Sequence, residues 1–84
     1  MEHFPLFLNL RGRRVLVVGA GLVAARKITL LLSAGAQVTV VAKAAHPSVL
    51  TQADQGHVTL HLRAFDAQWL QGVWLVIAAT NDEA

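Results

Sequence analysis

Three small residues give this sequence its most specific chemical signal. Gly19 and Gly21 are followed by Ala24, at the point where an apolar run ends and a helical pattern begins. Gly19 permits a tight strand-to-helix turn, Gly21 has no Cβ and lets a diphosphate approach the backbone, and Ala24 lets the helix lie close to the strand. The free N–H groups and the dipole at the amino end of such a helix attract an anion. The pattern predicts that Gly19, Ala20 and Gly21 bind the pyrophosphate of a dinucleotide.

Two cations follow this turn. Arg26 and Lys27 come early in the predicted helix, where each opposes the helix dipole at a cost of about 0.3–1 kcal/mol. A bound diphosphate would turn that penalty into attraction. Side chains that simply reach solvent would also explain them, and the sequence does not decide between the two roles.

The position that usually selects between NAD and NADP carries no acid. A carboxylate about 20 residues after the glycines normally binds the adenosine ribose. Here that stretch contains Lys43 and Ala44. Lys43 could suit the 2′-phosphate of NADP, or the ribose could be left to backbone groups. Residue types alone therefore leave the choice of cofactor open.

The histidine and tryptophan side chains indicate no second site. His57 and His61 are expected on one face of a strand, and the other two histidines are far away in sequence. No spacing is typical of a metal site, so we assign no metal ligands and expect structural or solvent-facing roles. Trp69 and Trp74 are expected in the core or in an interface.

Alternating strands and helices must position the glycine turn. Short apolar runs at residues 14–18, 37–41 and 73–79 predict three strands, the first and last of them buried. The alternating residues 58–62 predict a fourth strand with one more polar face. The alternation predicts an α/β fold: a Rossmann-like parallel sheet with flanking helices, incomplete at about four strands, in the order 3-2-1-4.

Spacings of three and four predict a helix over residues 22–34, closed by Gly35. Pro47 opens a second predicted helix that runs to about residue 55, and Asp66 is expected to cap a short helical turn through residue 70. The first helix carries two adjoining apolar stripes, formed by Ala24, Ile28 and Leu31 and by Val23, Leu30 and Ala34.

Composition excludes several classes of protein. Hydrophobic residues make up 55% of the 84 residues and charged residues 14%, which is far from a disordered chain. The absence of cysteine excludes disulfides and thiolate metal sites. Arg11, Arg13 and Arg14 are clustered, but three charges in one short loop more often mark a solvated turn than a nucleic-acid site, so we expect no nucleic-acid partner.

The sequence shows no recognisable targeting or membrane-spanning segment. The start of the sequence does not resemble a signal peptide, and no apolar run is long enough to span a membrane. We expect a cytoplasmic protein with no membrane partner. Because so short and apolar a chain stops just after the last predicted strand, we interpret residues 1–84 as the amino-terminal part of a Rossmann domain whose remainder is absent.

The combined pattern resembles the precorrin-2 dehydrogenase/ferrochelatase module of siroheme synthase across essentially the whole chain. The resemblance is carried by an apolar opening, the glycine turn with its two cations, the second strand and the end of the fourth strand. In order these are Pro5-Leu6-Phe7-Leu8, Arg13 to Arg26-Lys27, Leu30-Leu31-Leu32, Gly35-Ala36, Val38 to Ala42 and Ala78-Ala79-Thr80-Asn81.

The resemblance implies an enzyme of siroheme biosynthesis that oxidises precorrin-2 to sirohydrochlorin with NAD and then inserts ferrous iron. It implies cofactor contacts at Gly19, Ala20, Gly21, Leu22, Val23, Lys43, Ala44, Thr80 and Asn81. It also implies a homodimer. The family's catalytic aspartate and dimerisation region would lie beyond Ala84, so no catalytic residue is assigned and this piece alone is expected to be inactive. The alternative is a regulatory nucleotide-sensing Rossmann domain of a transporter or channel, which would normally carry the missing acid.

Overall fold

The chain folds into a parallel sheet with helices on one side. The computed structural model describes residues 10–79. Its elements are β1 (Arg14–Val18), α1 (Leu22–Ser33), β2 (Gln37–Ala42), α2 (Pro47–Asp54), β3 (Val58–Leu62), a single 3₁₀ turn η1 (Ala67–Leu70) and β4 (Leu75–Ala78). All strand pairs are parallel and the order is β3-β2-β1-β4, which confirms the predicted α/β fold and strand order.

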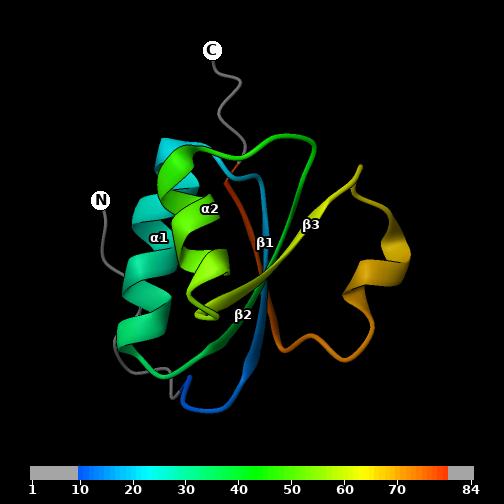
Figure 1. Cartoon of the computed structure of the whole chain (residues 1–84). Helices are drawn as coiled ribbons and strands as arrows, with labels where there is room; N and C mark the ends of the chain where they lie inside the picture. Colours follow the sequence, from blue (N-terminus) through cyan, green and yellow to red (C-terminus); the bar gives the residue numbers. More distant parts are fainter. Residues whose placement is uncertain (1–9, 80–84) are drawn as a thin grey trace.

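The two crossover helices and the third crossover lie on opposite faces of the sheet. Figure 1 shows α1 and α2 side by side on one face, while the segment with η1 lies on the other. The chain leaves β1 to one side for β2 and β3, and returns on the other side of β1 for β4. In open parallel sheets of this kind, ligands bind outside the carboxyl ends of the strands near such a reversal.

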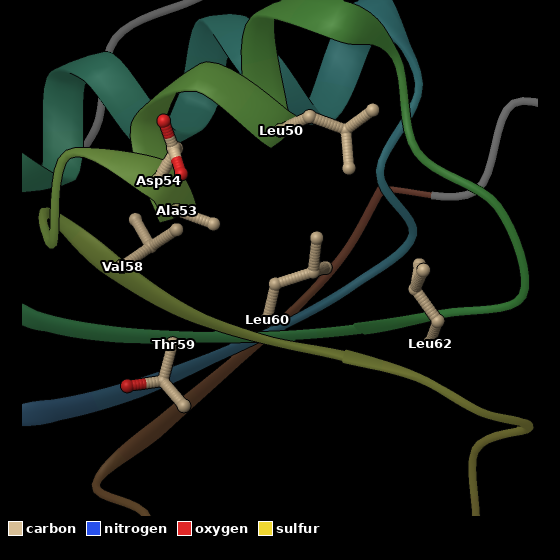
Figure 2. Close-up of a pocket in the computed structure, with 7 residues that line it drawn as sticks. All are labelled: Leu50, Ala53, Asp54, Val58, Thr59, Leu60 and Leu62. Carbon is tan, nitrogen blue, oxygen red and sulfur yellow. The ribbon is translucent and has the colours of Figure 1, made fainter.

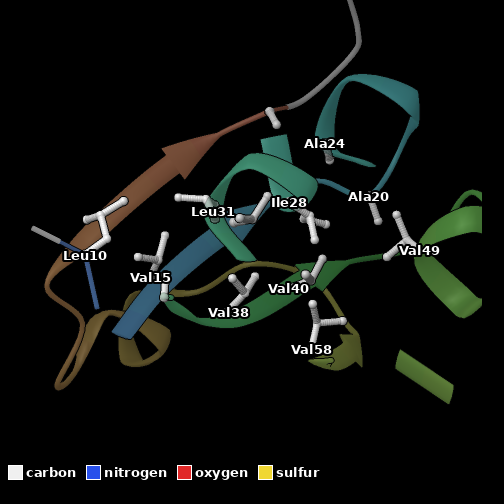
Figure 3. Close-up of a cluster of buried hydrophobic side chains, with 13 residues drawn as sticks. Leu10, Val15, Ala20, Ala24, Ile28, Leu31, Val38, Val40, Val49 and Val58 are labelled. Atoms are coloured by element: carbon white, nitrogen blue, oxygen red, sulfur yellow. The ribbon is translucent and has the colours of Figure 1, made fainter. Parts of the chain in front are cut away.

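The core lies between the sheet and α1. Figure 3 shows Val15, Val38 and Val40 of the sheet facing Ile28 and Leu31 of the helix. All five side chains are buried, and Val40, Ile28 and Leu31 have no exposed surface. This packing fixes the amino end of α1 against the carboxyl end of β1, where the glycine turn lies.

Helix α1 buries one of its two predicted apolar stripes and exposes the other. Ala24, Ile28 and Leu31 are fully buried, whereas Val23 and Leu30 are 40% and 44% exposed. Only one side of the helix faces the sheet, so only one of the two stripes is buried. Gly35, which follows it, has φ +83°, the left-handed conformation expected after a helix.

Local capping explains the other two helical segments. Helix α2 begins with Pro47, and the Nδ1 atom of His46 accepts a hydrogen bond of 3.1 Å from the backbone N–H of Ser48. The carboxylate of Asp66 accepts a hydrogen bond of 2.8 Å from the backbone N–H of Gln68, so Asp66 caps η1 as predicted. This hydrogen bond, together with one of 3.3 Å from the side-chain amide of Gln68, lowers the pKa of Asp66.

The prediction of a fully buried fourth strand is wrong for the described residues. Strand β4 is shorter than predicted, and its residues alternate between half-buried and exposed. Val76 is 43% exposed. Strand β4 is an edge of the described sheet and pairs only with β1 among the described strands, so hydrophobicity alone overstated its burial. No helix within residues 10–79 is long and apolar enough to cross a membrane.

Candidate dinucleotide site

The glycine turn joins β1 to α1 in the geometry of a phosphate loop. Gly19 has φ +114°, a conformation that side chains with a Cβ rarely adopt. Its N–H donates a hydrogen bond of 2.9 Å to the carbonyl oxygen of Val41. The N–H of His46 donates one of 2.7 Å to the carbonyl oxygen of Ala20. The turn is therefore tied to the end of β2 and to the residue before α2, and the backbone conformation at its first position requires glycine.

The amino end of α1 offers N–H groups to an anion. Gly21 is the N-cap residue, with φ −84° and ψ −163°, and it provides no side-chain cap. The first helical hydrogen bond runs from the N–H of Ala25 to the carbonyl of Gly21, so the N–H groups of Leu22 and Val23 make no bond within the helix. The first turn also contains no acidic residue. These features fit a pyrophosphate, which supplies the missing acceptors and complements the helix dipole.

A hollow of about 290 Å³ opens beside this turn, at the carboxyl ends of β1, β2 and β3. That volume is close to the lower end of small-molecule sites, roughly 300–1,000 Å³. Its walls are apolar apart from two cations, and none of the described residues that line it is acidic. The lining residues are Val18, Gly19, Ala20, Val41, Ala42, Lys43, Ala44, Arg63, Ala64 and Phe65.

The structure brings together most of the residues that the sequence predicted. Gly19, Ala20, Lys43 and Ala44 all line the hollow. Gly21, Leu22 and Val23 lie next to it at the start of α1, with Leu22 and Val23 exposed. Thr80 and Asn81 lie outside the described residues.

Arg63 and Phe65 line the hollow but were not predicted. Both follow β3, in the stretch between the strand predicted at residues 58–62 and the helical turn capped by Asp66, and the sequence suggested no role for them. A signal was present, since the residues after the carboxyl ends of neighbouring parallel strands meet at one edge of the sheet. Arg26 and Lys27 do not line the hollow; Arg26 is exposed and Lys27 half-buried.

A larger hollow of about 490 Å³ lies between α2 and the free edge of β3. Figure 2 shows Leu50 of the helix above Leu60 of the strand, with Asp54 at the rim and Thr59 pointing away. None of its lining residues is a cation, and none belongs to the glycine turn. We therefore place the dinucleotide in the smaller hollow, because size alone does not bind a diphosphate.

The prediction that His57 and His61 share one face is wrong. His57 lies in the turn before β3 and faces α2, where its Nδ1 is 2.8 Å from Oε1 of Gln52. His61 stacks on Trp69 of η1, with ring centroids 4.6 Å apart. The strand begins one residue after His57, so strand alternation does not govern that side chain. Residues 10–79 contain no group of three or more potential metal-ligating side chains.

The arginine cluster lies at the opposite end of the sheet, where β1 begins. The guanidinium of Arg13 lies 5.0 Å from the ring centroid of Trp74, and the N–H of Trp74 donates to the carbonyl of Arg14 at 2.8 Å. Both groups are at the amino ends of β1 and β4, away from the glycine turn. Trp74 is 44% exposed, and Trp69 is half-buried, so neither tryptophan belongs to the described core.

Comparisons with known proteins agree with this fold and with a dinucleotide-binding family. A family described as putative NAD(P)-binding matches residues 6–84. Siroheme synthases from Nitrosococcus oceani and Citrobacter koseri are 44% and 50% identical over all 84 residues, and the chain spans only 18% of the length of either relative. A solved structure of SirC, a precorrin-2 dehydrogenase, has a TM-score of 0.86 and 33% identity over 96% of this chain and 41% of that one. The chain belongs to the family of putative NAD(P)-binding proteins.

Proposed function

We propose that this chain is the amino-terminal, dinucleotide-binding part of an enzyme of siroheme biosynthesis that oxidises precorrin-2 to sirohydrochlorin. The observation that carries the proposal is the uncapped amino end of α1 beside a hollow with two cations and no described acid. Similarity to siroheme synthases and to SirC supports the choice of substrate. The relatives give no support to a regulatory domain of a transporter or channel.

Each part of the site has a physical task. The N–H groups of Leu22 and Val23 would hold the pyrophosphate, and the hollow at Lys43 and Ala44 would hold the adenosine half. Bound NAD supplies a hydride acceptor. No residue from 10 to 79 is assigned to proton transfer, so this part binds and orients the cofactor for groups elsewhere in the protein.

We further propose that the intact protein inserts ferrous iron into sirohydrochlorin, and that it is a cytoplasmic homodimer. These proposals concern the intact protein and not residues 1–84 alone. Iron here is a substrate, and we place its ligands outside residues 10–79.

The test is dehydrogenation by the purified full-length protein. Precorrin-2 and NAD are mixed without oxygen, and NADH formation is followed by absorbance. We expect NADH and sirohydrochlorin to form in equal amounts. Dinucleotide binding without turnover of precorrin-2 would contradict the enzymatic proposal and favour a sensing role. Sedimentation of the same sample tests the homodimer.

A further inference from the structure

His46 connects the glycine turn to the start of α2 through its backbone. Its N–H donates the hydrogen bond of 2.7 Å to the carbonyl oxygen of Ala20, the middle residue of the turn. Its own carbonyl oxygen accepts hydrogen bonds of 2.9 and 3.1 Å from the N–H groups of Val49 and Leu50, in the first turn of α2. Val49 is fully buried and belongs to the same core cluster as Ala20 (Figure 3). The glycine turn and the first turn of α2 are therefore held together at His46.

The side chain of His46 fixes this backbone. His46 is the N-cap residue of α2, with φ −62° and ψ 147°, and its Nδ1 accepts a hydrogen bond of 3.1 Å from the N–H of Ser48. The hydroxyl oxygen of Ser48 lies 2.9 Å from the same nitrogen. An N-cap acceptor of this kind satisfies an N–H that the helix leaves unbonded. Pro47, the next residue, favours the same extended backbone at His46, so the cap and the proline select one conformation.

The bond to Ala20 also sets the direction of an N–H group in the turn. The peptide between Ala20 and Gly21 is trans, like every described peptide bond, so its carbonyl and its N–H point in opposite directions. Holding the carbonyl at His46 therefore fixes the N–H of Gly21. Within residues 10–79 this N–H has no hydrogen-bond partner. It directly precedes the N–H groups of Leu22 and Val23, to which we assign the pyrophosphate.

His46 also closes the loop that forms one wall of the hollow. Lys43 and Ala44 line the hollow, and their loop runs from Ala42, the last residue of β2, to His46. Strand pairing holds one end of this loop, and the bond to Ala20 holds the other. His46 thereby keeps the wall assigned to the adenosine half in place against the turn assigned to the pyrophosphate.

We propose that His46 is a positioning residue of the dinucleotide site. Its side chain caps α2, the capped backbone holds the carbonyl of Ala20, and this bond keeps the N–H groups of the glycine turn in the geometry that binds a pyrophosphate. The role rests on the proposed dinucleotide site and adds to it a residue from outside the glycine turn. The imidazole acts through the backbone and needs no contact with the cofactor.

Three variants test the cap. His46→Ala removes the acceptor at the start of α2, whereas His46→Asn supplies a side-chain oxygen that is among the preferred N-caps. His57→Ala is the matched control, because His57 is also exposed and its Nδ1 lies 2.8 Å from Oε1 of Gln52, near the other end of the same helix. All three replaced side chains are exposed, so no cavity forms, and circular dichroism verifies that each variant is folded.

Binding is measured by calorimetry on the full-length protein with NAD and with ADP, which share the pyrophosphate. We expect His46→Ala to weaken both ligands about 2–10-fold, which is within the range of a lost N-cap. His46→Asn should restore both affinities, and His57→Ala should change neither. In the dehydrogenase assay, His46→Ala should raise the KM for NAD and leave kcat and the KM for precorrin-2 unchanged, the pattern of a lost binding interaction.

Amide hydrogen exchange measures the bond to Ala20 directly. We expect the amide at position 46 to exchange faster in His46→Ala than in the wild type, because local opening of the loop no longer breaks the cap. In His46→Asn the same amide should exchange at the wild-type rate.

The possible results distinguish a wrong role for His46 from a wrong binding site. If the wild-type protein binds neither NAD nor ADP, the dinucleotide site itself is wrong. If it binds both and His46→Ala binds them equally tightly, the positioning role is wrong and the site stands. Weaker binding in His46→Ala with unchanged exchange at position 46, or no recovery in a folded His46→Asn, would also overturn the role, because the effect would not then pass through the cap.

Discussion

Replacing Gly21 separates the stability of the fold from the affinity for the cofactor. Gly21 has φ −84°, so an L-residue fits its backbone without strain. It is also the N-cap of α1, a position at which serine is preferred because its hydroxyl accepts from an N–H of the first turn. Gly21→Ser should therefore raise the free energy of unfolding by a few tenths of a kcal/mol, on the order of 0.3.

The same hydroxyl would compete with the cofactor. It stands where the pyrophosphate approaches and occupies an N–H group that the pyrophosphate needs. We expect Gly21→Ser to weaken NAD at least about tenfold, which corresponds to roughly 1.4 kcal/mol. Gly21→Val adds bulk without an acceptor, so it should weaken NAD by at least as much and also lower stability, since valine is a poor N-cap.

The assay combines calorimetry with NAD and urea denaturation of the same full-length samples. We expect the affinity for NAD to fall in both variants. The free energy of unfolding should rise in Gly21→Ser and fall in Gly21→Val. Unchanged NAD affinity in a folded Gly21→Val or Gly21→Ser protein would refute the placement of the pyrophosphate at this turn.

Four further outcomes are expected. Gly19→Ala should lower stability by about 1–3 kcal/mol in urea denaturation, because φ at this position is +114°; wild-type stability would argue against this turn geometry. Ile28→Ala removes a fully buried side chain and should cost about 2–5 kcal/mol by the same measurement. Replacing His57 and His61 together by Gln should leave iron insertion near wild type, and a loss of that rate with normal NAD binding would show that they take part. The lowered pKa of Asp66 stabilises the fold above the ordinary aspartate pKa, and this contribution is lost as the pH falls through the lowered value; Asp66→Asn should make acid unfolding curves less steep.

The sequence predicted the elements around the site because local rules set them. Continuous apolar runs marked the strands, and Gly35 and Pro47 marked where one helix ends and the next begins. The usual Rossmann topology then gave the strand order 3-2-1-4, which the structure confirms. The glycine turn could be recognised from a local motif, although hydrogen bonds to Val41 and His46 also hold it in the structure.

What the sequence missed depends on contacts between distant segments. Arg63 joins the hollow because β2 and β3 are neighbours, with Ala42 opposite Leu62, so its place depends on strand pairing and not on a local motif. Val76 was predicted to be buried because it is apolar, yet burial depends on what covers each face of β4. His57 was misplaced because the strand begins one residue later than the alternation suggested.

A structure of the full-length protein with bound NAD tests the central claim most directly. We predict that the pyrophosphate oxygens lie within hydrogen-bond distance of the N–H groups of Leu22 and Val23, and that the adenosine ribose lies over Lys43 and Ala44. Thr80 and Asn81 should contact the same cofactor. A dinucleotide bound elsewhere, for example in the hollow between α2 and β3, with the turn at Gly19 to Gly21 unoccupied, would contradict the account.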